Sequence, residues 1–348
     1  MITRRMYRGR RAASVENAAL RVTVLEEGGH IAEVFDKASG TNPLWTPPWR
    51  SIEPSTYDAA VHDVYGDGVD ARLLAGIMGH NLCLDIFGGP SREEAAAGLP
   101  VHGEASVVRY ELADDHGLAM TTELPLAAIR FRRRLALRDR ALHVQESVEN
   151  LSGIDRPIGW TEHVTLGPPF LVKGATEFRS SAMRSQVYES AFGSHAYLKP
   201  GATFDWPSAP RCDGGTADLR RLTDMPASSA YTAHLMDPAR PAFFVAFSPA
   251  SRLAFGYVWK ASDFPWMGIW EENHSRTARP WNGVTLTRGM EFGVSPYPET
   301  RRQMIDRGTL FGAPTYRWLP AASRIDVEYW VVARTADAIP ESLDPPHE

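Results

Sequence analysis

Short runs of alternating apolar and polar residues recur along the chain, and most of them end at a turn. Residues 19–25 read ALRVTVL and are followed by a Gly-Gly pair, after which residues 30–36 read HIAEVFD. Residues 141–150 alternate in the same way after a charged break at 138–140. A period of two places successive side chains on opposite faces of a strand, and short polar turns join antiparallel neighbours. The pattern therefore predicts hairpins over 19–36 and 128–150.

Further strand-like runs are bounded by glycine, proline, aspartate or serine. They lie at 242–247, 253–260, 284–292 and 325–333. Helical signals are few: one short helix is expected after Ser91, and another between Pro298 and Gly308, with proline at its start and glycine at its end. Many short strands without alternating helices favour packed antiparallel sheets over a βαβ fold. We expect one all-β domain over 1–348, in which residues 1–14 are a flexible or peripheral segment.

Composition limits the classes of function. The chain has 348 residues, of which 43% are hydrophobic, and a net charge of −5, so it has enough apolar residues for a core and no basic excess for nucleic acid. The arginine-rich start lacks the apolar run of a secretory signal, and no apolar run approaches the ~18 residues of a membrane span. Cys83 and Cys212 are expected to be reduced thiols. These features predict a cytoplasmic protein without nucleic-acid or membrane partners.

Three segments differ from ordinary strands. His102 precedes Gly103, which permits close backbone approach and leaves the imidazole uncrowded. His163 lies on a strand that runs into a Gly-Pro-Pro loop at 167–169. Glu291 lies within an otherwise apolar strand before a proline-rich turn, where burial would raise the pKa of its carboxyl and prepare a general base. Taken one at a time, each of these residues also fits a structural role.

A fourth segment, 263–276, interleaves aromatic and polar side chains and includes Trp270 and Glu272. Aromatic faces pack on the C–H faces of sugars while carboxylates bind hydroxyls, so the mixture suits a carbohydrate cleft. A buried tryptophan pair beside a charged loop fits the same residues. Zinc bound by the two histidines and the glutamate also stays open, because a β fold can bring distant ligands together. The chain has no nucleophilic-serine elbow, P-loop or dinucleotide fingerprint.

The order of these segments resembles that of the aldose 1-epimerase, or galactose mutarotase-like, superfamily. The resemblance rests on the opening hairpin at 28–40, the His102-Gly103 pair, His163 at the end of a strand, and Glu291 followed by Tyr297-Pro298-Glu299. Each motif is short, so the specificity comes from their order and spacing over nearly the whole chain. The resemblance implies a β-supersandwich of antiparallel sheets with few short helices and a concave sugar site.

The same resemblance implies a mechanism. Glu291 would remove the proton of the anomeric hydroxyl, and His163 would protonate the ring oxygen, so that the ring opens and closes again on its other face. His102 would hydrogen-bond the sugar near the reacting carbon. This chemistry needs an acid and a base but no cofactor or metal. Substrate-binding roles are predicted for His80, Trp270 and Glu272. The expected partner is a small-molecule carbohydrate, and the expected state is a monomer or homodimer.

The chain departs from the superfamily pattern in two places. Segment 79–90 replaces the usual Asn-Arg motif before the first histidine, and 164–170 reads VTLGPPF where Pro-Tyr-Phe-Asn is common. Two alternatives to an epimerase therefore stay open. One is a non-catalytic carbohydrate-binding protein with the same cleft, and the other is a metal-dependent sugar isomerase or lyase.

Overall fold

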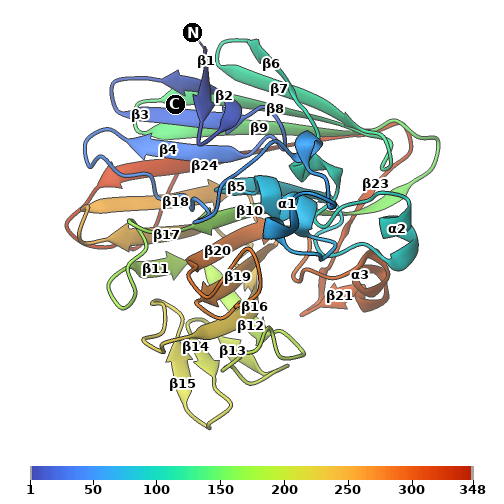
Figure 1. The fold of residues 1–348 in the computed structure, drawn as a ribbon. Helices are drawn as coiled ribbons and strands as arrows, with labels where there is room; N and C mark the ends of the chain where they lie inside the picture. The colour runs from blue at the N-terminus through green and yellow to red at the C-terminus, as the bar shows by residue number, and fades with distance from the viewer. Residues whose placement is uncertain (1, 346–348) are drawn as a thin grey trace.

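Two large antiparallel sheets make up most of the structure, a computed structural model that describes residues 2–345 (Figure 1). The 12-stranded sheet runs, in spatial order, through β1 (Thr3–Tyr7), β2 (Arg10–Glu16), β3 (Leu20–Leu25), β4 (Ile31–Asp36), β5 (His80–Asp85), β10 (Arg156–Leu166), β20 (Leu286–Gly293), β19 (Trp266–Asn273), β16 (Ser228–Met236), β12 (Ala182–Val187) and β13 (Thr203–Asp205), with β23 (Arg317–Leu319) paired to β10. The 8-stranded sheet runs through β11 (Glu177–Ser180), β17 (Ala242–Ser248), β18 (Leu253–Trp259), β24 (Arg324–Thr335), β9 (Ala141–Asn150), β8 (Ile129–Arg138), β7 (Leu118–Leu124) and β6 (Glu111–Asp114). This architecture confirms the all-β fold class that the alternating patterns predict.

Short elements connect or cover the sheets. Two small hairpins are β14 (Ser208–Pro210) with β15 (Thr216–Asp218), and β21 (Thr309–Leu310) with β22 (Ala313–Pro314). The helices are α1 (Ala71–Gly76), α2 (Arg92–Ala96) and α3 (Arg301–Arg307), and the 3₁₀ turns are η1 (Pro54–Thr56), η2 (Asp63–Tyr65) and η3 (Glu104–Ser106). The sequence predicts α2 and α3, and both begin with a capping box. Helix α1 has no such signal. Among the described residues, no helix is long and apolar enough to cross a bilayer.

The predicted hairpins form at the expected places. Strand β3 pairs with β4, and β8 pairs with β9 through an unbroken register from Ile129–Asn150 to Arg138–Ala141. The segment 1–14, predicted to be flexible or peripheral, contains regular strands. Of residues 1–14, residue 1 lies outside the described residues, but most of the rest belong to β1 and β2 at the edge of the larger sheet. Arg10 is fully buried there because its guanidinium donates to Glu53 and to three further oxygens.

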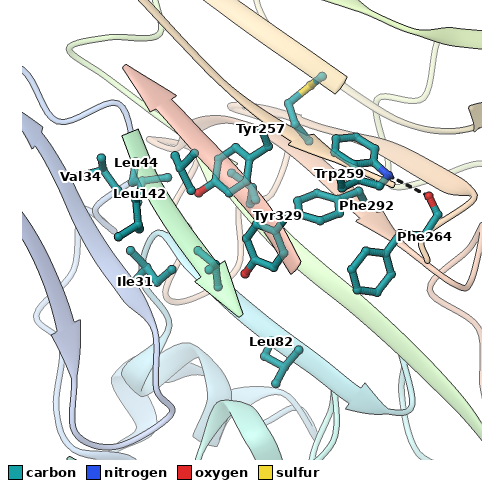
Figure 2. Packing of buried hydrophobic residues seen from close by; sticks show 14 of the residues in the cluster. Ile31, Val34, Leu44, Leu82, Leu142, Tyr257, Trp259, Phe264, Phe292 and Tyr329 are labelled. Carbon is teal, nitrogen blue, oxygen red and sulfur yellow. Dashed lines mark hydrogen bonds between the residues drawn. The ribbon is translucent and has the colours of Figure 1, made fainter. Parts of the chain in front are cut away.

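The main core lies between the two sheets and is rich in aromatic rings (Figure 2). Trp259 from the smaller sheet stacks on Phe292 from the larger one, with ring centroids 4.3 Å apart and planes 16° apart. The Trp259 indole nitrogen donates to the carbonyl of Phe264 at 2.8 Å, so its one polar group is satisfied (Figure 2). Burying each such ring stabilises the fold by roughly 2–3 kcal/mol.

Alternation along the central strands of the larger sheet gives it two different faces. On β10, Trp160 and Val164 point into the main core, whereas His163 between them points to the other face. On β20, Phe292 belongs to the core and Glu291 does not. A second hydrophobic cluster covers this other face and includes Tyr231 from β16 and Trp270 from β19, together with residues of α1. The face away from the main core therefore holds His163 and Glu291.

Candidate active site

His163 and Glu291 lie side by side on neighbouring strands. The register of β10 against β20 pairs Glu162 with Phe292 and Thr165 with Gly289, which places His163 opposite Glu291. The His163 Nε2 lies 3.0 Å from the Glu291 Oε1, and both side chains are less than a tenth exposed. An imidazole and a carboxylate in contact form an acid–base pair that exchanges a proton over a very short distance.

The remaining atoms of this pair also have partners. His163 Nδ1 lies 3.1 Å from the Thr165 hydroxyl, which can donate to a neutral imidazole or accept from a protonated one. Tyr231 donates its hydroxyl to Glu291 Oε2 at 3.2 Å. Burial, followed by the nearby Glu291 carboxylate, raises the pKa of Tyr231 well above its ordinary value, so its hydroxyl stays a donor. The Thr165 and Tyr231 hydroxyls thus hold the His163 imidazole and the Glu291 carboxylate in place.

Two glycines leave room for the Glu291 carboxylate. Gly268 lies opposite Glu291 on β19, and a Cβ there would lie 2.0 Å from the Tyr231 hydroxyl. A Cβ at Gly289 would lie 2.6 Å from Glu291 Oε1. Real Cβ atoms do not approach other atoms so closely, and the buried Tyr231 and Glu291 have little space to move. Glycine at these two positions is therefore part of the site.

His102 reaches the same place from a loop. Its ring centroid lies 5.2 Å from that of His163, and its Nδ1 contacts the carbonyl of Phe87 at 2.5 Å. Burial, followed by His163, lowers the pKa of His102 to about 3, so the ring is neutral at ordinary pH. A carbonyl only accepts, so Nδ1 carries the proton and Nε2 keeps a free lone pair. Gly103 allows this approach, because a Cβ there would lie 2.0 Å from the carbonyl oxygen of Leu84.

These side chains open onto one cavity of about 230 Å³. Helix α1 and the second hydrophobic cluster supply apolar walls, and the strands supply the polar floor. The lining includes Asp70, Leu74, Phe87, His102, His163, Phe192, Tyr231, Trp270, Arg276, Trp281 and Glu291. The structure thus brings together His102, His163, Glu291 and Trp270, four of the six residues that the sequence nominates.

Glu272 and His80, for which substrate-binding roles are predicted, do not line the cavity. Glu272 is buried, and both its oxygens accept hydrogen bonds from the Ser275–Arg276 segment. It shapes the loop that carries Arg276 and contacts Arg276 Nε at 3.4 Å. Its role in the structure is therefore to hold that loop.

His80 points into the main core because alternation on β5 turns it away from the cavity. It pairs in register with Val164 of β10, and Val164 belongs to the core face. Its Nε2 lies 2.8 Å from Glu162 Oε2, and Glu162 also accepts from Arg133 at 2.8 Å. This buried ionic group packs between the sheets, where Glu146 also binds Arg133. Burial raises the pKa of Glu146 to about 8.

Sequence analysis does not single out three polar residues of the cavity: Asp70, Tyr231 and Arg276. Tyr231 lies in a buried strand whose sequence, SSAYTAHLM, has no catalytic motif. Arg276 belongs to the aromatic segment 263–276, so the same signal that pointed to Trp270 contained it. Asp70 follows a Gly-rich loop and precedes a helix that the sequence does not predict. Nothing in the local pattern reveals that these residues meet.

The described residues contain no group of three or more histidine, cysteine, aspartate or glutamate side chains arranged to hold a metal ion. His163 and Glu291 are close enough to bind one metal ion together. The Nδ1 of His102 faces the carbonyl of Phe87, and its ring lies 5.2 Å from that of His163. Cys83 and Cys212 are both free thiols, the first buried and the second exposed.

Comparisons with known proteins establish the fold. No protein-family model matches the chain, and no curated protein matches it. A protein from Klebsiella pneumoniae provisionally named an aldose 1-epimerase superposes with a TM-score of 0.66 and 10% identity, over 94% of this chain and 80% of that one. A galactose mutarotase-like protein from Clostridium acetobutylicum superposes with a TM-score of 0.61 and 11% identity, over 96% and 98% of the two chains.

A galactose mutarotase related enzyme from Lactobacillus acidophilus gives a TM-score of 0.58 and 13% identity, over 94% of this chain and 99% of that one. At such identities the likeness concerns the fold. The chain therefore has the galactose mutarotase-like architecture that the sequence resemblance implies, with a sequence that diverges strongly from these proteins.

Proposed function

We propose that this protein interconverts the two anomers of an aldose by acid–base ring opening in the cavity around His163 and Glu291. The observation that carries the proposal is the 3.0 Å contact between His163 Nε2 and Glu291 Oε1 at the floor of that cavity. The fold shared with mutarotase-like proteins supports it. The proposal assigns the roles of base and acid to these two residues.

The geometry of a cyclic sugar explains why adjacent groups suit this reaction. The anomeric hydroxyl and the ring oxygen are bonded to the same carbon, so the proton to be removed and the oxygen to be protonated lie close together. An acid and a base on neighbouring strands can reach both oxygens of one hemiacetal at once. A single cross-strand pair therefore supplies both groups without any large movement.

The proton and electron movements balance within this pair. Glu291 accepts the proton of the anomeric hydroxyl, the O–H electrons form the carbonyl of the open chain, and the bond from the anomeric carbon to the ring oxygen breaks. His163, in its protonated form, gives its Nε2 proton to the ring oxygen. Rotation about the bond between C1 and C2 presents the other face of the aldehyde, and the reverse transfers close the ring.

His102 and the aromatic walls position the sugar. The free lone pair on His102 Nε2 accepts a hydrogen bond from a hydroxyl near the reacting carbon. Trp270 and Phe87 offer aromatic surface to the C–H faces of the ring. The cavity of about 230 Å³ is smaller than the usual ligand pocket of ~300–1,000 Å³, which favours a monosaccharide over an oligosaccharide.

Exchange of sugar anomers, followed by NMR magnetisation transfer over a panel of aldoses, tests the proposal. Wild-type protein should accelerate exchange of at least one sugar above the buffer rate, and Glu291→Gln should remove that acceleration while unfolding at the same temperature. Calorimetric titration of the same sugars separates catalysis from binding. A protein that binds an aldose tightly but never accelerates its exchange would be a carbohydrate-binding protein, and the epimerase proposal would be wrong.

A further inference from the structure

Asp70 occupies an unusual position at the start of α1. It is the N-cap residue, yet its side chain makes no capping hydrogen bond. A carboxylate at that position normally accepts a bond from a backbone N–H of the first turn. Among the described residues, the Asp70 carboxylate has no hydrogen-bond or ion-pair partner, and it lines the cavity instead. Gly68 leaves space for it, because a Cβ at Gly68 would lie 2.5 Å from Asp70 Oδ1.

Arg276 presents unused donors to the same cavity. Its guanidinium carbon lies 4.7 Å from the centre of the Trp281 ring and 5.3 Å from that of Trp270. These two rings are nearly perpendicular, at 83°, and hold the guanidinium by cation–π contacts. Behind it, Glu272 lies 3.4 Å from Nε, and no hydrogen bond from the side chain to another described residue is formed. The outer nitrogens of a positioned guanidinium are thus free to bind a ligand.

The two unpartnered groups lie in one small cavity with the acid–base pair. Burial lowers the pKa of Arg276 while the Glu272 and Asp70 carboxylates raise it, and Asp70 and Arg276 form no ion pair with each other. A fork of N–H donors and a carboxylate acceptor complement a polyol, since each hydroxyl both accepts and donates a hydrogen bond.

We infer that Asp70 and Arg276 are specificity-determining residues that bind hydroxyls remote from the anomeric carbon and select an uncharged monosaccharide over sugar acids and sugar phosphates. This inference rests on the proposed epimerase function of the same cavity. The free donors of Arg276 alone would also suit a carboxylate or phosphate. The charges around Arg276 therefore decide which class of ligand the cavity selects.

The charges in and behind the cavity disfavour an anion. Asp70 and Glu291 line it, and Glu272 lies directly behind Arg276. Arg276 supplies one positive charge, and His163 supplies a second only when it is protonated. Three carboxylates against one or two cations leave the surroundings negative before any ligand enters. A sugar acid would therefore meet net electrostatic repulsion from these carboxylates.

The experiment measures kcat/KM for anomer exchange with six compounds: galactose, galacturonic acid and galactose 6-phosphate, and glucose, glucuronic acid and glucose 6-phosphate. The variants are Asp70→Asn and Arg276→Gln. Matched controls are Asp67→Asn in the same loop and Arg279→Gln in the neighbouring one, both exposed residues that do not line the cavity. Thermal unfolding of every variant checks that it is folded.

Wild type should prefer a neutral sugar over its two charged derivatives by at least tenfold. Arg276→Gln should lower kcat/KM for the neutral sugar by about 10- to 100-fold, because a hydrogen bond from a charged group is lost. Asp70→Asn should lower activity on the neutral sugar and narrow its advantage over the acid and the phosphate. The control variants should match wild type on all six compounds.

Two results would overturn the inference: a charged sugar as the preferred wild-type substrate, or an unchanged preference in Asp70→Asn. If no sugar of any class is turned over, the epimerase function fails, and calorimetric binding of the same six compounds then tests the inference separately. Preferential binding of a neutral sugar that Asp70→Asn reduces would support it. Binding only of the acid or phosphate, or of nothing, would reject it.

Discussion

The His163 imidazole and the Glu291 carboxylate face each other across β10 and β20, with Nε2 and Oε1 3.0 Å apart. The two residues are 128 positions apart in the chain, as 291 − 163 gives, and antiparallel register alone makes them neighbours. Each carboxylate oxygen has a separate partner, since Tyr231 holds the other one. The proposed acid and base thus lie on strands rather than on loops, which is the more precise of the two arrangements.

Removing either member of the pair should abolish most of the activity. Glu291→Gln and His163→Gln should each lower kcat for anomer exchange by about 10²- to 10⁴-fold, because each loses one proton-transfer group. The double variant should be little worse than either single one, since the two residues act as a unit. Exchange rates of the three variants measure this coupling. Independent, multiplicative losses would show that the residues do not act on one hemiacetal.

His102 should contribute to sugar binding without adding a protonation step to the pH profile of activity. His102→Phe keeps an aromatic ring beside Phe87 but removes the Nε2 acceptor, so kcat/KM should fall by about 10- to 100-fold. The pKa of His102 is about 3, so the wild-type and variant profiles of activity against pH should have the same shape between pH 5 and pH 9. If the wild-type activity falls at one end of this pH range and the His102→Phe activity does not, His102 would instead be a proton-transfer group.

The space that Gly289 leaves beside the Glu291 carboxylate should be as important for activity as the carboxylate itself. A methyl group at Gly289 would lie 2.6 Å from Glu291 Oε1, so Gly289→Ala must displace the base from His163. Activity should fall by about 10²-fold or more, as misplacement of a catalytic group by ~1 Å does. Gly153→Ala is a matched control, because a methyl group there meets nothing within 4 Å. Near-normal activity in Gly289→Ala would mean that the base tolerates displacement.

Local patterns predict much of this fold because its elements are local. The β8–β9 hairpin alternates imperfectly before a charged turn and cleanly after it, and α3 has proline before it and glycine after it. Strands β1 and β2 were missed because an arginine-rich segment resembles a solvated terminus. Arg10 is buried only because Glu53 and three other oxygens, brought from elsewhere in the chain, satisfy it.

The candidate site also has some residues that sequence motifs predict and others that only tertiary packing places. His102, His163 and Glu291 carry motifs whose order along the chain can be recognised. His80, predicted to bind substrate, lies on the core face, because parity along β5 decides between cavity and core and no local motif reveals that parity. Asp70 and Arg276 line the same cavity only because two loops pack around tryptophan side chains. No spacing rule connects positions so far apart in the chain. Tertiary packing, rather than local sequence, determines these parts of the site.

Buried neutral histidines should make the protein sensitive to acid. Burial lowers the pKa of His30, His102 and His234 to about 3, against an ordinary value of 6.5. Because these folded-state values lie below the unfolded one, unfolding takes up protons as the pH falls. Their contribution to stability is complete above pH 6.5 and is lost as the pH falls from there toward 3. Each histidine adds a slope of about 1.4 kcal/mol per pH unit within that window.

His234 isolates this effect because it does not line the cavity. Its imidazole lies between the Thr232 and Ser185 hydroxyls, and His234→Gln retains the capacity for hydrogen bonds with both. The variant should lose less stability than wild type between pH 6 and pH 4, by up to about 2–3 kcal/mol over that interval. Urea unfolding at pH 6, 5 and 4 measures the difference, with His116→Gln at an exposed position as the control. Parallel curves for wild type and His234→Gln would show that His234 takes up no proton on unfolding.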